Sequence, residues 1–293
     1  MTPLKFAVLG GISLFPKVVR HLCRQGRKPD LLIFSAEKDV GLLHRGLDSL
    51  GIETWVTQDI HTETSRLKTL GLDLLVCIEY PQILKKDVLR IPRLGCANLH
   101  TSLLPQYRGR HPVTWALIRG EDHIGITLHF MDENIDEGDI VLQDEVPVEK
   151  DDDYRDVFAK LVPVGCRMVE LGLNQIETGS FYRRKQRAAK ATYLRKRMPG
   201  DGRINWRESS RSVSRLINAL VDPMPNAFAR YQGGEVRFTR AYLGSHAGEV
   251  LAKTTDGRYV ISTGDSVVLV ASDRTLKIGT ILGQKEKARI RSF

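Results

Sequence analysis

The sequence predicts an α/β protein: a Rossmann-like, mostly parallel sheet with helices on both faces, followed by a small β-barrel domain. Three observations predict this fold class. Continuous apolar runs alternate with amphipathic helical patterns through the first half, as in parallel sheets covered on both faces. Short strands separated by glycine-containing turns fill the last third, which is typical of a small barrel. A basic stretch with Pro199-Gly200-Asp201-Gly202 separates the two parts.

The apolar runs of the first half are the first expected strands. They cover residues 5–9, 31–34, 72–78 and 96–100. Two helical stripes between them consist of Leu14, Val18, Val19 and Leu22, and of Val40, Leu43, Leu47 and Leu50. Further strands are expected over residues 124–130 and 140–148, and a helix over residues 157–173 closes this part.

The last third begins with one expected helix, capped by Ser209 or Ser210. Its buried stripe consists of Val213, Leu216, Ile217 and Leu220. The expected turns between the strands lie at Gly233-Gly234, Asp256-Gly257 and Gly264-Asp265. The sequence therefore predicts an α/β domain over residues 1–182, a basic linker over residues 183–203 and an OB-like β domain over residues 204–293.

The composition is that of a globular protein. The chain has 293 residues, of which 42% are hydrophobic and 27% charged, enough for a core in two domains. No apolar run approaches the ~18 residues of a membrane span, and the first residues lack a secretory signal. The scattered cysteines favour reduced thiols. They are Cys23, Cys77, Cys96 and Cys166. We expect a cytoplasmic protein without a membrane partner.

Two opposed charge blocks lie behind the net charge of +9. Residues 132–156 hold twelve acidic residues and two basic ones, and residues 182–215 hold twelve basic residues and two acidic ones. The basic block could bind RNA, a nucleotide diphosphate or only water, and composition does not choose among them. In the acidic block we interpret Asp151, Asp152 and Asp153 as a solvated loop.

Gly10-Gly11 ends the first apolar run and invites comparison with dinucleotide-binding loops. The G-x-G-x-x-G spacing is missing, and neither Glu37 nor Asp39 is suitably placed to bind a ribose. We therefore expect a tight turn between a strand and a helix, without nicotinamide or flavin binding.

A candidate for catalysis lies in the fourth apolar run. Asn98 and His100 project on the same face of the strand expected over residues 96–100, because side chains alternate with period two. Asp136 lies in a later loop, where Gly138 permits a sharp turn that can direct its carboxylate back towards the strand ends. An amide, an imidazole and a carboxylate together are a plausible catalytic set.

Several ordered motifs resemble those of the folate-dependent formyltransferases. This family includes methionyl-tRNA formyltransferases, glycinamide ribonucleotide formyltransferases and amino-sugar N-formyltransferases. The motifs are Asn98-Leu99-His100, Ser102-Leu-Leu-Pro-x-Tyr-Arg-Gly109, Gly125-Ile-Thr127, Ile135-Asp136-x-Gly138-Asp139, Arg197-Met-Pro-x-Asp-Gly-x-Ile-x-Trp206 and Pro223-x-Pro-x-Ala-Phe228. The resemblance spans most of residues 1–182 and continues into the small domain, which implies the formyltransferase fold.

The resemblance implies 10-formyltetrahydrofolate as the formyl donor, a primary amine as the acceptor, and no metal. Attack of the amine creates a tetrahedral oxyanion, to which Asn98 would donate an N–H. His100 would act as general base or as a second oxyanion donor, and the sequence leaves this open. Asp136 would orient His100, stabilise its charged form and relay protons through a water.

The resemblance also implies that the pterin lies against the backbone after the third apolar run, in a mostly apolar slot. The candidate residues for binding the folate are Tyr80, Pro81, Gln82, Ile83, Leu84 and Asp136.

Two classes of acceptor compete. The basic block and the C-terminal barrel favour initiator tRNA. Against tRNA, the chain lacks a long basic insertion after the second strand, and it has Tyr107-Arg-Gly-Arg-His-Pro112 where tRNA enzymes tend to have Trp-Arg-Gly-Ala-Ala-Pro. That segment is more similar to the amino-sugar N-formyltransferases, so a nucleotide-linked amino sugar is the favoured acceptor.

The favoured partners are therefore small molecules. The candidate residues for binding the acceptor are Gly10, Ser102, Tyr107, Arg108, Arg110 and Trp115. Aromatic stacking and charge-assisted bonds to a diphosphate would hold a sugar nucleotide there. Another small or peptide amine, or a non-catalytic homologue that binds folate or RNA, stays open, as does a homodimer.

Overall fold

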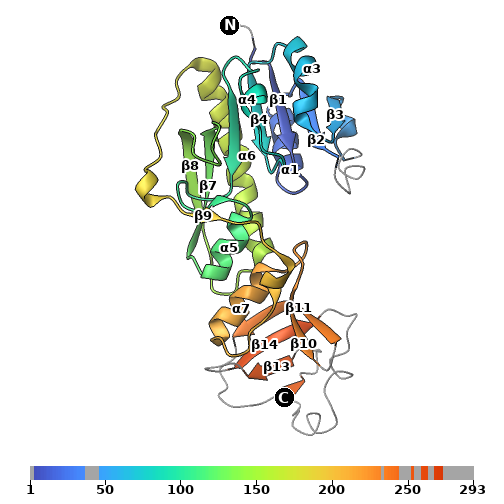
Figure 1. Ribbon diagram of the computed structural model, residues 1–293, viewed down its shortest axis with the longest axis vertical. Helices are drawn as coiled ribbons and strands as arrows, with labels where there is room; N and C mark the ends of the chain where they lie inside the picture. The colour runs from blue at the N-terminus through green and yellow to red at the C-terminus, as the bar shows by residue number, and fades with distance from the viewer. Residues whose placement is uncertain are drawn as a thin grey trace. The chain divides into compact units, whose positions relative to one another are not determined.

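A seven-stranded sheet forms the centre of the first of two units in the computed structural model (Figure 1). The structure describes residues 3–36, 46–231, 234–243, 252–253, 259–262 and 267–272. The first unit comprises Met1–Gly109, Gly125–Val146 and Ala159–Tyr193, and the second comprises Arg110–Ile124, Pro147–Phe158 and Leu194–Phe293.

The strand order of the central sheet is β3-β2-β1-β4-β5-β7-β8. The strands are β1 (Phe6–Gly10), β2 (Leu31–Ser35), β3 (Glu53–Thr57), β4 (Leu74–Ile78), β5 (Cys96–His100), β7 (His123–Phe130) and β8 (Ile140–Pro147). The neighbouring strands β3, β2, β1, β4 and β5 are parallel to one another, and β7 runs antiparallel to β5. The mostly parallel sheet confirms the predicted fold class.

Helices cover both faces of this sheet. On one face, buried side chains of the strands pack with Ile60 of η2 (Ile60–Glu63), Leu67 of α3 (Thr64–Thr69) and Val88 of α4 (Lys86–Leu89). On the other face, Phe15 of α1 (Phe15–Arg24) meets Phe34 edge to face, with ring centroids 5.2 Å apart. There, Gly165 of α6 (Tyr154–Thr178) lies close enough to Leu99 and Ile126 for its helix to pack on β5 and β7.

Gly10 and Gly11 form the expected tight turn after β1. A Cβ on Gly10 would lie 1.8 Å from the ring of Phe15, and a Cβ on Gly11 would lie 2.6 Å from the carbonyl oxygen of Glu79. Both clashes are prohibitive, so only glycine allows the chain to enter α1 here.

The sequence did not predict β3. In this edge strand Trp55 and Thr57 are buried, whereas Glu53 and Val56 are exposed. The strand therefore lacks the continuous apolar run of its neighbours. Glu37 and Asp39 lie outside the described residues, as do residues 40–45 of the predicted stripe over residues 40–50. Its described part contains buried Leu47 and the short helix η1 (Asp48–Leu50).

In the described part of the second unit, the helices α5 (Pro112–Arg119) and α7 (Ser210–Ala219) pack on each other. The hydroxyl of Ser209 accepts a hydrogen bond from the N–H of Ser212, so Ser209 is the cap of α7. A five-stranded sheet follows, in the order β10-β11-β14-β13-β12. Its strands are β10 (Ala227–Tyr231), β11 (Gly234–Leu243), β12 (Ala252–Lys253), β13 (Tyr259–Ser262) and β14 (Val267–Ser272), all in antiparallel pairs.

The predicted turns at Gly233, Asp256-Gly257 and Gly264-Asp265 lie outside the described residues. Closure of this sheet into an OB-like barrel therefore stays a prediction, as do the three predicted domain boundaries.

The expected solvated loop at residues 151–153 is wrong for Asp153, whose side chain is fully buried. Its carboxylate accepts hydrogen bonds from the N–H groups of Arg155 and Asp156 at the start of α6. It also pairs with the guanidinium groups of Arg155 (2.6 Å) and Arg240 (3.2 Å). Asp153 is thus the helix cap, and two cations compensate the cost of burying its charge.

The predicted basic linker contains short elements of its own. They are η3 (Ala188–Lys190), β9 (Tyr193–Leu194) and η4 (Pro199–Gly202). Arg184 forms a bridge with Ile140 of β8, and β9 pairs with the two-residue strand β6 (Arg108–Gly109). In the described residues, none of the helices is long and apolar enough to cross a membrane.

Candidate active site

Strand β5 carries the first two candidate residues at its carboxyl end. In the register of the sheet, Asn98 lies opposite His129 of β7, and His100 lies opposite Thr127. Asn98 and His100 therefore project on one face, as the sequence predicts. The edge where β5 ends is the usual place for a ligand in an open α/β sheet.

The loop between β7 and β8 carries Asp136. It folds back sharply: a Cβ on Gly138 would lie 1.9 Å from the carbonyl oxygen of Phe130, so this position requires glycine. Asp136 has a φ of 55°, the left-handed conformation that few residues other than glycine adopt. This backbone turn directs the carboxylate of Asp136 towards β5.

The structure brings the three predicted catalytic residues together. Oδ1 of Asp136 lies 3.5 Å from Nδ2 of Asn98, and Oδ2 lies 3.7 Å from Nδ1 of His100. The N–H of Gly109 donates to Oδ2 at 2.8 Å. The side chains of Asp136 and His100 are 13% and 8% exposed, so their charges act in a largely desolvated site.

The hydrogen bonds of His100 indicate which of its nitrogens can react. Nε2 lies 2.9 Å from the carbonyl oxygen of Tyr107, which can only accept, so Nε2 carries a proton. Nδ1 is then the nitrogen that can gain or lose a proton, and it faces Asp136. A carboxylate beside this nitrogen stabilises the imidazolium that forms when the ring takes up a proton.

His129 is a buried member of the site that the sequence analysis missed. Its Nδ1 lies 2.8 Å from the carbonyl oxygen of Phe130 and donates to it, so Nε2 accepts from Nδ2 of Asn98 at 3.2 Å. Burial lowers the pKa of His129 to about 4, against the opposing effect of Asp136. The neutral ring therefore fixes the Asn98 amide with its N–H₂ group inside the site.

Arg108 lies beside this group but is turned into the protein, with only 3% of its surface exposed. Its guanidinium donates to Oε1 of Gln186, to Oε1 of Glu137 and to the hydroxyl of Tyr193. These partners occupy most of its N–H groups. Sequence reasoning missed Gln186 because nothing in a basic stretch singles out one glutamine.

The segment after β5 is held by its own polar groups. The hydroxyl of Ser102 donates to the carbonyl oxygen of Gln106, and Ser102 is buried. Tyr107 has a φ of 61°, its N–H donates to the hydroxyl of Thr192, and its carbonyl accepts from His100. Ser102 and Tyr107 thus shape the loop beside His100, and their predicted contacts with an acceptor stay predictions.

The predicted folate-binding segment follows β4. The amide of Gln82 is bound to the N–H of Ile60, the carbonyl oxygen of Gln58 and the hydroxyl of Ser35. Leu84 lies in the core, and the side chain of Ile83 is 59% exposed. The hydroxyl of Tyr80 is buried without a hydrogen-bond partner, and burial raises the pKa of Tyr80. Gln82 and Leu84 thus anchor the segment by their side chains, and its predicted contacts with a folate stay predictions.

The remaining predicted residues are Gly10, Arg110 and Trp115. Gly10 ends β1 and is fixed by Phe15, as described above. Arg110 is exposed, and Trp115 lies on α5, where its Nε1 donates to the carbonyl oxygen of Arg195 at 3.2 Å. Arg110 and Trp115 belong to the second unit. Their roles, and that of Gly10, stay predictions.

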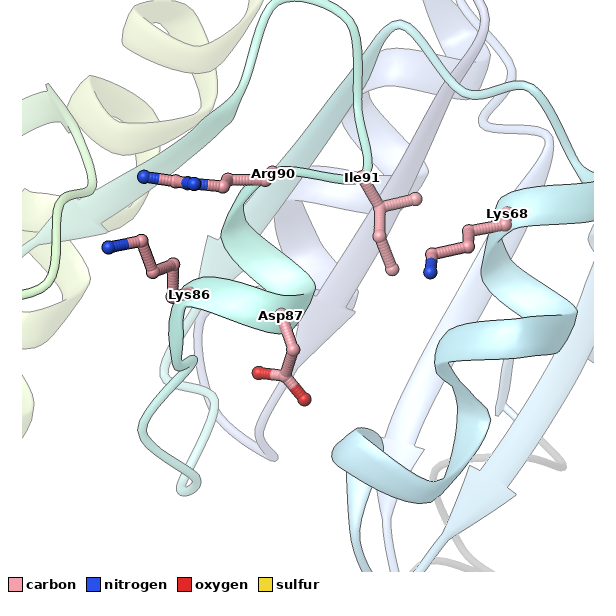
Figure 2. A pocket seen from close by; sticks show the side chains of 5 residues that line it. All are labelled: Lys68, Lys86, Asp87, Arg90 and Ile91. Carbon is pink, nitrogen blue, oxygen red and sulfur yellow. The ribbon is translucent and has the colours of Figure 1, made fainter.

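A shallow hollow of about 580 Å³ lies along α3 and α4, away from the catalytic group. Figure 2 shows Lys68 reaching it from α3, while its other lining residues come from α4 and the chain that follows. These are Lys86, Asp87, Arg90 and Ile91. Lys86 and Arg90 already pair with Glu133, and Asp87 with His61, so we assign no function to this hollow.

Comparison with known families identifies both parts of the chain. The pattern of the family described as "Formyl transferase" matches residues 55–168, and that of "Formyl transferase, C-terminal domain" matches residues 196–293. A methionyl-tRNA formyltransferase of Alkaliphilus metalliredigens is 34% identical over 209 residues, which cover 70% of this chain and 66% of the relative. A methionyl-tRNA formyltransferase of Halothermothrix orenii is 33% identical over 75% of this chain and 73% of its own length.

Solved structures show the same fold. The N-formyltransferase of Helicobacter canadensis, in complex with folinic acid and dTDP-3-aminofucose, has a TM-score of 0.72. The alignment covers 92% of this chain and 99% of that one, with 19% identity. At this identity the likeness extends to the fold and leaves the acceptor open.

Proposed function

The chain belongs to the formyl transferase family, and we propose that it moves the formyl group of 10-formyltetrahydrofolate to the primary amine of a nucleotide-linked amino sugar. The observation that carries the proposed chemistry is the meeting of Asn98, His100 and Asp136 at the end of β5. In the reaction, the amine nitrogen bonds to the formyl carbon, and the bond from that carbon to N10 of the folate breaks. One proton leaves the amine and one is delivered to N10.

Asn98 is the proposed donor to the oxyanion. One hydrogen of its Nδ2 is directed at Nε2 of His129, and the other lies towards Oδ1 of Asp136 in a long contact of 3.5 Å. This second hydrogen would turn from Asp136 to the developing negative charge. His100 is placed to take the proton of the amine on Nδ1, because its Nε2 is bound to the carbonyl oxygen of Tyr107. Asp136 would stabilise the resulting imidazolium and pass the proton on through a water.

The acceptor is proposed from the segment Tyr107–Pro112. Arg110 follows Gly109 directly in the chain, and the N–H of Gly109 donates to the carboxylate of Asp136. A guanidinium in this segment is a suitable hydrogen-bond donor to a diphosphate joined to an amino sugar. The fold is compatible with this class of acceptor, since an enzyme of the same fold was crystallised with dTDP-3-aminofucose.

Initiator tRNA is the second candidate, and the sequence relatives favour it, since both described above are methionyl-tRNA formyltransferases. A competition assay read by mass spectrometry separates the two. Charged initiator tRNA is offered with 10-formyltetrahydrofolate in one vessel, and a panel of UDP- and dTDP-linked amino sugars in another. We expect a formylated sugar nucleotide. Formyl-methionyl-tRNA as the product would instead make initiator tRNA the acceptor and the basic block of residues 182–215 the candidate surface for binding it.

Arg110→Ala tests the proposed contact with the acceptor. We expect the KM for the acceptor to rise about tenfold or more, the usual cost of a lost hydrogen bond to a charged group, while the KM for the folate changes little. Steady-state kinetics with each substrate varied in turn provide both constants. Arg119→Ala, another exposed arginine of the second unit, is the control. Equal changes in both constants for Arg110→Ala would contradict a role in binding the acceptor.

A further inference from the structure

The catalytic carboxylate belongs to a backbone turn that is stabilised by side chains from elsewhere in the chain. Asp136 has a left-handed φ of 55°, and such conformations persist in residues other than glycine only where neighbours enforce them. The carbonyl groups of Asp136 and Gly138 need hydrogen-bond donors of their own.

Gln186, from the segment between α6 and β9, supplies them. Its Nε2 donates to the carbonyl oxygen of Asp136 and to that of Gly138, both at 2.8 Å. The side-chain amide of Gln186 is thus hydrogen-bonded to the turn on both sides of Glu137. Both bonds join neutral groups, so they fix the direction of the turn without adding charge to the site.

Arg108 fixes Gln186 in turn. Its Nε and Nη2 both donate to Oε1 of Gln186, at 3.1 and 2.8 Å, which leaves the amide only one orientation. Its Nη1 donates to Oε1 of Glu137 at 2.9 Å, within the same turn. Tyr193 bonds to both Arg108 and Glu137 and closes the ring of contacts. The buried charge of Arg108 is thereby paired, as burial requires.

We propose that Arg108 and Gln186 are positioning residues that hold the turn of residues 136–138, and with it the carboxylate of Asp136, in the geometry needed for formyl transfer. The proposal rests on the proposed function in assigning catalysis to Asp136. It gives Arg108 a task inside the protein in place of a contact with the acceptor. It also makes the segment of residues 184–193 part of the active site's support.

Gln186→Glu is the sharpest variant. A glutamate keeps an oxygen for Arg108, but it has no N–H groups for the two carbonyls. We expect kcat to fall about 10- to 100-fold, because small displacements of a catalytic group have effects of this size. Both KM values should stay within about twofold, since no substrate contact is removed. Arg108→Lys, which keeps the charge and loses the fork, should act in the same direction. Gln25→Glu, at an exposed position after α1, is the matched control.

A second measurement needs no acceptor. The N–H of Gly109 donates to Oδ2 of Asp136, so its amide proton resonance reports the position of the carboxylate. We expect this resonance to move upfield in Gln186→Glu and to stay in place in Gln25→Glu. An unchanged kcat, a loss expressed only in KM, or an unchanged resonance in Gln186→Glu would overturn the proposal. If the wild-type protein formylates no acceptor, the proposed function fails, and the resonance alone then decides whether Gln186 positions Asp136.

Discussion

His100→Ala is expected to lower kcat by about two to four orders of magnitude, the range observed when a general acid or base is removed. The ring leaves the site together with Nδ1, the nitrogen that faces Asp136. Asp136→Asn should cause a comparable loss, because the amide keeps the shape but cannot stabilise an imidazolium. Single-turnover formyl transfer measures both rates. Titration with a stable folate analogue should show nearly unchanged binding.

His100→Gln distinguishes the two roles open for His100, because a glutamine amide can donate to an oxyanion but cannot take up a proton. We expect His100→Gln to be as slow as His100→Ala, as the loss of a general base requires, whereas a largely restored rate would make His100 an oxyanion donor. Asp132→Asn, an exposed position in the loop that carries Asp136, is the matched control and should keep the wild-type rate. Near-normal turnover in His100→Ala would contradict both roles.

Asp153→Ala is expected to lower the free energy of unfolding by about 3 kcal/mol. The change removes the cap of α6 and leaves Arg240 without its nearest carboxylate. The estimate lies at the lower end of the range for buried pairs, because the side chain of Arg155 is 51% exposed and well solvated. Urea unfolding at neutral pH measures the difference.

The effect of Asp153→Ala should depend on pH. Burial alone would raise the pKa of Asp153, but its hydrogen bonds and the charge of Arg155 more than offset this, so the pKa lies below its usual value. The stabilisation is therefore present above the unfolded pKa of about 4 and is lost as the pH falls through the folded pKa. Asp151→Ala, an exposed neighbour, should be close to wild type at every pH. A pH-independent difference for Asp153→Ala would mean that its charge contributes nothing.

The central sheet could be predicted where burial on both faces leaves a continuous apolar run. β5 has the predicted bounds, and its period of two correctly places Asn98 and His100 on one face. The edge strand β3 could not be predicted in this way, because some of its side chains face water and interrupt the apolar run. The prediction for Asp153 was wrong because a carboxylate at a helix start and one in a solvated loop look alike in a sequence.

The rest of the site depends on pairings that a single sequence does not encode locally. His129 has the same alternation as its neighbours, and only the antiparallel register of β7 on β5 places it opposite Asn98. Gln186 lies in a stretch with no hydrophobic period. It comes near the site because Arg184, two residues earlier, forms a backbone bridge with Ile140 of β8. Both residues belong to the site through tertiary contacts alone.

The segment of residues 101–108 is tied to Asp136 at both ends, by His100 before it and by the N–H of Gly109 after it. Its span in space is thus set by one carboxylate group. Apart from Ser102 and Arg108, whose side chains are bound within the protein, the side chains of the segment can vary to suit different acceptors, whereas an inserted or deleted residue would pull one end away. Related enzymes of differing specificity should therefore keep the number of residues between these two anchors constant. Libraries for new acceptors should vary the other identities here and leave the length unchanged.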